Sequence, residues 1–311
     1  MKTPRPPRRA ARRSLLSAAL LALACAPAVV AIDAEDETRE VETWRAQRYE
    51  RLRNPNGWLS LAGLFWLKEG DNALGSADGT PVKLPAGKAP ARAGTIRFEK
   101  GQATLVPAPD AGLKVDGRPA TAATPLADDD PGPANQVDVG ELNFVLIERA
   151  GRIGVRLRDP GTELLQSFSG IEHWPVDVAW RFEARFEPAP SPRTIPVPNV
   201  LGFDENIANP GTVVLTIDGK EYRLTALDDT GDGRLFLVFG DRTNGKETYG
   251  GGRFLYTDPP VDGRVIVDFN RAYNPPCVFS HYATCPLPPP GNKLPLAILA
   301  GEKKFVAPHA S

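Results

Sequence analysis

After residue 57 the chain is a succession of short apolar runs separated by turns rich in Gly, Pro and Asp. Its 29 glycines and 32 prolines leave little room for long helices, because proline breaks a helix and glycine is a poor helix former. Short apolar runs bounded by such residues are typical of β-strands. We therefore expect a mostly β protein of antiparallel strands, and not a doubly wound nucleotide-binding sheet.

The expected strands of the first half are 58–67, 95–100, 103–107, 113–117, 142–150 and 152–159. Short hairpin connections are expected at Glu99-Lys100-Gly101 and Arg149-Ala150-Gly151. We interpret the two halves as two antiparallel β units, the first a sandwich and the second a sandwich or barrel. The expected organisation is a signal peptide (1–31), an N-terminal helix (32–56), a β-sandwich unit (57–159), a connector (160–195), a C-terminal β unit (196–303) and a tail (304–311).

One helix is expected, over residues 35–53, and it ends at the Asn-Pro-Asn-Gly run that follows. Val41, Trp44 and Leu52 share one face of this helix, and Arg45 and Arg48 flank that face. The apolar side is expected to dock on the body of the protein.

The first 31 residues have the pattern of a signal peptide: six basic residues, an apolar core too short to span a bilayer, and small residues up to Ala31. This predicts export to the periplasm or the exterior. The stretch Ala11–Leu16 is similar to a twin-arginine signal, so the export route stays open. A lipid anchor at Cys25 is a less favoured alternative.

Removal of residues 1–31 leaves 31 Lys and Arg against 38 Asp and Glu. An acidic chain of this kind does not attract nucleic acid or anionic lipid through a general positive field. Residues 32–311 contain no second long apolar run, so no membrane-spanning segment is expected in the mature chain. The remaining partner classes are a small molecule or a glycan.

One hairpin register can be worked out from the two-residue turn Asp218-Gly219, which places Leu215 opposite Tyr222 and Val213 opposite Leu224. The next hairpin, 253–257 with 264–270, would place Arg253 opposite Asp268 if Thr257 pairs with Arg264. Arg253 and Asp268 would then form either a site that binds an anion or a carboxamide, or a cross-strand ion pair that fixes the following loop.

The segment 268–290 concentrates polar side chains on a proline-rich backbone that cannot form a helix. Such fixed irregular segments often carry functional groups. Together with the glycine-rich stretch before residue 253, it predicts a ligand site in the C-terminal unit. The candidate ligand-binding residues are Arg242, Tyr249, Arg253, Asp268, Asn270, Tyr273, Asn274 and Tyr282.

Two carboxylates in this region, Asp268 and Glu247, could act as acid or base in a hydrolase if they were desolvated. The sequence has no GxSxG, HExxH or phosphate-loop motif, so the familiar hydrolase and nucleotidase classes find no support. The run Asp228–Arg234 begins like a calcium loop but has Phe239 where a bidentate Glu is required. No cofactor and no metal are expected.

Cys277 and Cys285 are the cysteines that would remain after signal removal, and in an oxidising compartment such a pair most often forms a disulfide. Their spacing with His281 leaves a metal site as a second interpretation, although the flanking prolines argue against the helix it would need. A nucleophilic cysteine is a third. His173 is expected to be a packed structural residue.

Four stretches carry a resemblance to a known family: NPNGWLSLAGLFWLKEGDNALGS, NFVLIERAGRIGVRLRD, GDRTNGKETYGGGRFLY and DFNRAYNPPCVFSHYATCPLPPPGNKLPLAILAGE. They resemble family 1684 of the domains of unknown function over about residues 40–303. The position of His281 is commonly proline in that family, which argues against the metal and Cys–His interpretations. The first unit is also weakly similar in element order to forkhead-associated sandwiches, without their phosphothreonine-reading Arg and Ser.

The leading functional hypothesis from sequence is an exported protein that binds a small polar ligand or glycan fragment at its C-terminal unit. A hydrolase using Asp268 or Glu247 is one alternative. A structural protein of the cell envelope, in which the polar cluster only locks a loop, is the other.

Overall fold

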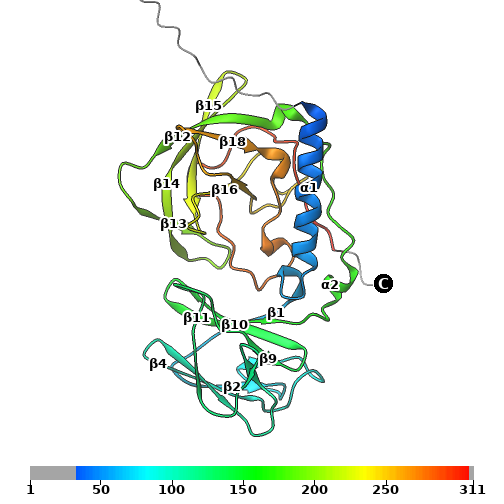
Figure 1. Ribbon diagram of the computed structural model, residues 1–311, viewed down its shortest axis with the longest axis vertical. Helices are drawn as coiled ribbons and strands as arrows, with labels where there is room; N and C mark the ends of the chain where they lie inside the picture. Colours follow the sequence, from blue (N-terminus) through cyan, green and yellow to red (C-terminus); the bar gives the residue numbers. More distant parts are fainter. Residues whose placement is uncertain (1–32, 308–311) are drawn as a thin grey trace, which may run out of the picture. The chain divides into compact units, whose positions relative to one another are not determined.

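The computed structural model describes residues 33–307, all of which belong to one compact unit, Asp33–Ser311. The expected signal peptide, Cys25 and the twin-arginine stretch lie outside these residues. Strands dominate the described part, and most of their pairings are antiparallel, which confirms the mostly β class with one long N-terminal helix (Figure 1). Within residues 33–307 no helix has both the length and the apolar character that a membrane crossing requires.

Two sheets form the first β unit. A six-stranded sheet has the order β1-β11-β10-β9-β6-β7, and a five-stranded sheet has the order β3-β2-β4-β5-β8. The strands are β1 (Leu61–Trp66), β2 (Gly70–Gly75), β3 (Val82–Lys83), β4 (Gly94–Glu99), β5 (Gln102–Pro107), β6 (Lys114–Val115), β7 (Arg118–Pro119), β8 (Thr124–Leu126), β9 (Val137–Val139), β10 (Leu142–Arg149) and β11 (Arg152–Arg158).

The two sheets share one apolar core, so this part is a sandwich as expected. Ile96 and Leu105 contribute from the five-stranded sheet, and Phe144 and Val155 from the six-stranded sheet, all fully buried. Alternate residues of a strand face opposite sides. The alternate positions of β11 therefore point away from this core, toward the rest of the protein, and Arg156 is among them.

The second β unit is a seven-stranded sheet with the order β17-β16-β15-β14-β12-β18, and β13 pairs with β14 beside this path. It curls into a half-barrel (Figure 1). Its strands are β12 (Arg181–Pro188), β13 (Thr194–Pro198), β14 (Asp204–Ile217), β15 (Lys220–Asp228), β16 (Leu235–Phe239), β17 (Arg253–Thr257) and β18 (Arg264–Asp268).

The β14–β15 hairpin has the predicted register. Leu215 pairs with Tyr222 and Val213 with Leu224 across the turn. Asp218 and its neighbouring glycine have φ values of 50° and 72°, the left-handed geometry that a two-residue hairpin turn requires. The same geometry occurs at the two predicted turns of the sandwich.

The predicted pairing of the next two strands is wrong. β17 pairs with β16, which places Arg253 opposite Phe239. β18 pairs instead with β12 at the other end of the sheet, which places Asp268 opposite Arg181. The reason is that β16 and β12 form the ladder hydrogen bonds that a simple hairpin of β17 and β18 would have used.

The sheet opens between β15 and β16, whose register pairs Leu227 with Phe236. Beyond that pair Asn292, which is fully buried, bridges the strands by accepting from the Thr225 amide and donating to the Thr225 and Val238 carbonyls.

Helix α1 (Ala34–Arg53) forms for local reasons. Asp33 caps its first turn by accepting from the Asp36 amide at 2.8 Å, and its first turn is acidic and its last basic, as the helix dipole favours. Its buried face, however, carries three ionisable residues in addition to Val41 and Leu52: Glu37, Arg45 and Arg48. Its docking surface is therefore partly ionic, and the predicted flanking role of the two arginines is wrong.

The short elements are α2 (Glu163–Ser167), η1 (Trp58–Ser60), η2 (Val178–Trp180), η3 (Phe269–Arg271) and η4 (Pro276–Val278).

Candidate functional site

Residues 33–307 enclose a cleft of about 1560 Å³. Helix α1, the β10–β11 turn, the start of β14 and the residues after β15 form its walls, and the predicted loop after β18 closes it. Its lining includes the aromatic residues Trp44, Trp58, Phe236, Phe254, Tyr256, Tyr273 and Phe279. It also includes charged residues of both signs: Arg48, Arg51, Arg149, Arg234, Arg271, Asp129, Asp130, Glu148, Asp204, Glu205, Asp228 and Asp229.

The helix wall presents cations and an aromatic surface. The Arg48 guanidinium stacks on the Tyr273 ring at 4.3 Å from its centroid, and Trp44 lies 6.1 Å from the same ring, centroid to centroid. Arg51 forms no ion pair with any described residue, and burial, followed by the charge of Arg48, lowers its pKa. This wall is therefore suited to the flat face of a ligand that also carries acceptor groups.

A second aromatic stack lies beside the residues after β15. Tyr256 stacks on Phe236 with centroids 4.7 Å apart, and the Arg234 guanidinium lies 5.0 Å from the Tyr256 centroid. The Tyr256 hydroxyl donates to Asp229 at 2.6 Å. Asp229 is solvent-accessible at the cleft surface, yet the concave wall around it partly desolvates its carboxyl and raises its pKa.

Glu205 contributes a further carboxyl from the start of β14. Asn199 donates to it at 2.8 Å, and its pKa is raised chiefly by burial. Arg149 and Arg156 lie near enough to oppose this effect. Glu205 and Asp229 are thus two cleft carboxyls that retain a proton at higher pH than an ordinary carboxyl.

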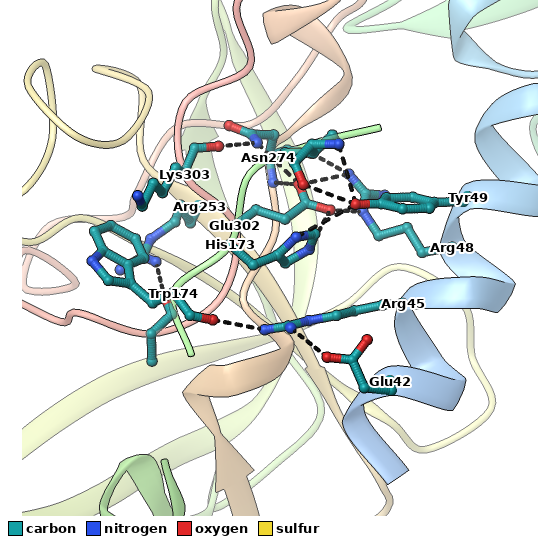
Figure 2. A network of polar contacts seen from close by, with 12 residues as sticks. Glu42, Arg45, Arg48, Tyr49, His173, Trp174, Arg253, Asn274, Glu302 and Lys303 are labelled. Carbon is teal, nitrogen blue, oxygen red and sulfur yellow. Dashed lines mark hydrogen bonds and ion pairs between the residues drawn. The ribbon is translucent and has the colours of Figure 1, made fainter. Parts of the chain in front are cut away.

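A polar network fixes helix α1 against the C-terminal part (Figure 2). Glu302, fully buried, pairs with Arg48 and accepts from the backbone and side-chain nitrogens of Asn274 at 2.7 and 3.0 Å. Arg48 also donates to the Asn274 carbonyl at 3.0 Å. His173 lies 4.0 Å from Glu302 and within 3.4 Å of the Tyr49 hydroxyl, and burial lowers its pKa. Asn274 and Arg48 therefore connect the cleft wall to the body of the protein.

Arg253, a predicted ligand-binding residue, is fully buried and does not line the cleft. Its guanidinium pairs with Asp241 at 2.7 Å and donates to the carbonyls of Ile298 and Ala300. The Trp174 ring lies 5.6 Å from it. Because protein groups occupy this guanidinium, its role in the structure is to hold the C-terminal segment on β17.

Asp268 and Asn270 also lie away from the cleft lining. Asp268 accepts from the backbone and side chain of Asn270 at 2.9 Å, and Arg271 lies 3.0 Å from its other oxygen. Glu37 of helix α1 is in contact with the same carboxyl. Burial and the neighbouring Asp268 raise the pKa of Glu37 to about 7, although Arg181 lies 3.2 Å away.

Cys277 and Cys285 are free thiols, so the predicted disulfide is absent from the structure. The Cys285 sulfur instead accepts from the backbone nitrogen of Cys277 at 3.1 Å. The contact with Cys285 lowers the pKa of Cys277, with a further contribution from Tyr249. No metal-binding group of His, Cys, Asp and Glu occurs among residues 33–307.

The remaining predicted residues are peripheral to the cleft. Arg242, Glu247 and Tyr282 are exposed, and none of them lines it. Tyr249 contacts the cysteine loop instead, and burial raises its pKa. Of the predicted ligand-binding set, the structure brings only Tyr273 and Asn274 to the cleft.

The sequence reasoning missed the main cleft residues outside residues 268–290: Trp44, Arg48, Arg51, Trp58, Arg149, Glu205, Asp229 and Tyr256. A signal for some of them existed. Asp228 and Asp229, at the end of β15, begin a run that resembles a calcium loop. Arg48 flanks the apolar face that the sequence predicts for helix α1.

Comparison with known proteins places the chain in a family. A family described as "Protein of unknown function (DUF1684)" matches residues 166–303. The solution NMR structure of an uncharacterized protein from Haloarcula marismortui is 30% identical, covering 45% of this chain and 80% of that one, with a TM-score of 0.39. The chain belongs to the DUF1684 family. No curated protein matches this DUF1684 chain. The likeness of its first unit to forkhead-associated sandwiches stays a prediction.

Proposed function

We propose that this protein binds a polar, elongated ligand of the glycan-fragment class in the cleft between helix α1 and the C-terminal β unit. The observation that carries the proposal is the cleft of about 1560 Å³ with its aromatic walls. Small-ligand pockets usually measure roughly 300–1,000 Å³, so this one has room for more than a single small molecule.

The chemistry of the walls supports a sugar. Sugar rings have apolar C–H faces and hydroxyl edges, and they need flat apolar surfaces beside groups that both donate and accept. Trp44 and Tyr256, both partly exposed in the cleft lining, supply such surfaces. Gln47, Asn206 and the cleft carboxylates supply the hydrogen-bonding groups. Export, expected from the sequence, would give the protein access to extracellular glycans.

The proposal changes the site residues that the sequence suggested. Tyr273 and Asn274 are kept, and Trp44, Trp58, Tyr256 and the helix arginines replace those that lie elsewhere. Glu247 is exposed away from the cleft, and Asp268 is engaged with Asn270 and Arg271. Neither is therefore placed to act on a ligand bound there.

Calorimetric titration with neutral and acidic tetrasaccharides tests the proposal. The chain should bind at least one member of a panel of chitotetraose, maltotetraose and tetragalacturonate. Tyr256→Ala should weaken that binding by about tenfold, since an aromatic contact contributes roughly 0.5–1.5 kcal/mol beyond its buried area. Tyr222→Ala, on the half-barrel but outside the cleft lining, is the matched control and should bind as the unmodified chain does. Equal binding by both variants would place the ligand elsewhere, and no binding by the unmodified chain would refute the glycan class.

Hydrolysis is a second candidate, favoured by one observation. Partial desolvation by the surrounding wall raises the pKa of Asp229, and a carboxyl that keeps its proton to higher pH is better suited to protonate a leaving group. If the bound glycan is cleaved, Asp229→Asn should abolish turnover and leave binding intact. Turnover that persists in this variant would exclude Asp229 as the acid.

A further inference from the structure

Arg156 is a buried cation without a carboxylate partner. Its residue is 4% exposed, and no carboxylate oxygen of residues 33–307 lies within 4.0 Å of its guanidinium. Its hydrogen-bond partner is a single hydroxyl, Thr284 Oγ1, at 3.1 Å from Nη2. Its Nε is buried with no partner at all among the described residues. A buried charge without a counterion is costly, because no carboxylate offsets the hydration that the guanidinium loses.

A second guanidinium converges on the same hydroxyl. Arg149 Nε donates to Thr284 Oγ1 at 3.3 Å, while its two terminal nitrogens bind Asp129 at 2.9 Å each. Asp129 thus pairs with Arg149, and Arg156 has no carboxylate at contact distance. Burial, and next the charge of Arg149, lowers the pKa of Arg156 to about 10, which Asp129 opposes without reversing.

Arg156 does not itself line the cleft, but its neighbours do. Thr284, Arg149 and Trp58 line it, and the Trp58 ring lies 5.4 Å from the Arg156 guanidinium, with 38% of that tryptophan exposed. Glu205 faces the two arginines from β14, and burial raises its pKa. A ligand that stacks on Trp58 would therefore direct one edge at the guanidinium nitrogens of Arg156.

We propose that Arg156, whose Nη2 donates to Thr284, forms an oxyanion subsite that binds a carboxylate, phosphate or sulfate group of the ligand, with the charge of Arg149 beside it. The inference rests on the proposed glycan function for the rest of the ligand, and it narrows the class to acidic sugars. The planar fork of Arg matches such groups in a bidentate manner. Trp58 would cover the apolar face of the sugar ring next to its acidic group.

Anions alone test the subsite without any glycan. Thermal unfolding is followed in sulfate, phosphate or acetate at millimolar concentrations, with ionic strength held constant by sodium chloride. At least one of the three anions should raise the midpoint above that in chloride, and its identity tells which acidic group is bound. Arg156→Gln should abolish the rise. Arg97→Gln, an exposed arginine on β4 of the same sandwich, should keep it and so controls for general salt effects.

A third variant covers the case in which Arg156→Gln does not fold. Arg156→Lys keeps the charge but loses the fork, and its apparent affinity for the anion should fall about tenfold. The inference is overturned if either Arg156 variant responds as the unmodified chain does, or if none of the three anions acts. If the chain binds a tetrasaccharide but Arg156→Gln responds to the anion as the unmodified chain does, only the subsite is refuted. If the anion response depends on Arg156 but the chain binds no tetrasaccharide, only the proposed glycan function is refuted.

Discussion

The buried ion pair between Arg48 and Glu302 should be essential for docking helix α1. Glu302 pairs with Arg48 and accepts from Asn274, and Arg48 is only 8% exposed. Glu302→Ala removes this carboxylate and therefore leaves the buried Arg48 charge without an anionic partner. Loss of one member of a buried pair costs roughly 3–5 kcal/mol. For a chain of this size, 1 kcal/mol shifts the unfolding midpoint by about 2–4 °C, so the midpoint should fall by roughly 6–20 °C.

The assay is urea and thermal unfolding followed by circular dichroism. Glu187→Ala, which breaks an exposed ion-pair cluster with Arg185 and Arg223, is the matched control and should change stability little. The double variant Arg48→Met with Glu302→Met should recover much of the loss, because no charge is then left buried. A loss below about 1 kcal/mol in Glu302→Ala would refute the view that this pair holds the helix.

Three further outcomes are expected. Glu37, whose pKa is raised to about 7 by burial and by Asp268, is neutral in both states at low pH and disfavours the folded state once it ionises. Stability should therefore fall between about pH 4.5 and 7 by at most about 3 kcal/mol, and urea unfolding of Glu37→Gln should lack this fall; an unchanged pH profile would contradict the assignment. Iodoacetamide should alkylate Cys277 before Cys285, whose pKa burial raises, as peptide mass spectrometry can show; the reverse order would contradict the thiol geometry. Arg253→Met should alter unfolding but leave tetrasaccharide affinity unchanged, and an affinity loss of tenfold would return Arg253 to the site.

Local signals in the sequence predicted much of the fold. Helix α1, the sandwich strands and the β14–β15 register follow from capping residues, alternation and a two-residue turn, all of which act over a few residues. The pairing of β17 and β18 did not follow. It depends on two other strands of the sheet, because β17 pairs with β16 and β18 pairs with β12. The residues around β17 and β18 do not indicate these partners.

The site was predicted in part, for a related reason. Tyr273 and Asn274 lie in the polar segment that the sequence singled out, and both reach the cleft. Arg253 and Asp268 are as polar as ligand-binding residues, but the fold uses them as internal ion pairs. Sequence alone does not separate these two uses, because burial and partner distance decide between them. The opposite wall, with Arg149 and Trp58, comes from the first β unit. No local sequence pattern indicates that these residues lie close to Tyr273 and Asn274.

The most direct test of the central claim is a crystal structure of the chain with the tetrasaccharide that binds most tightly. The account predicts sugar rings against Trp44 and Tyr256, between helix α1 and the start of β14. A ligand bound on another face of the protein, with the cleft left without it, would contradict the account.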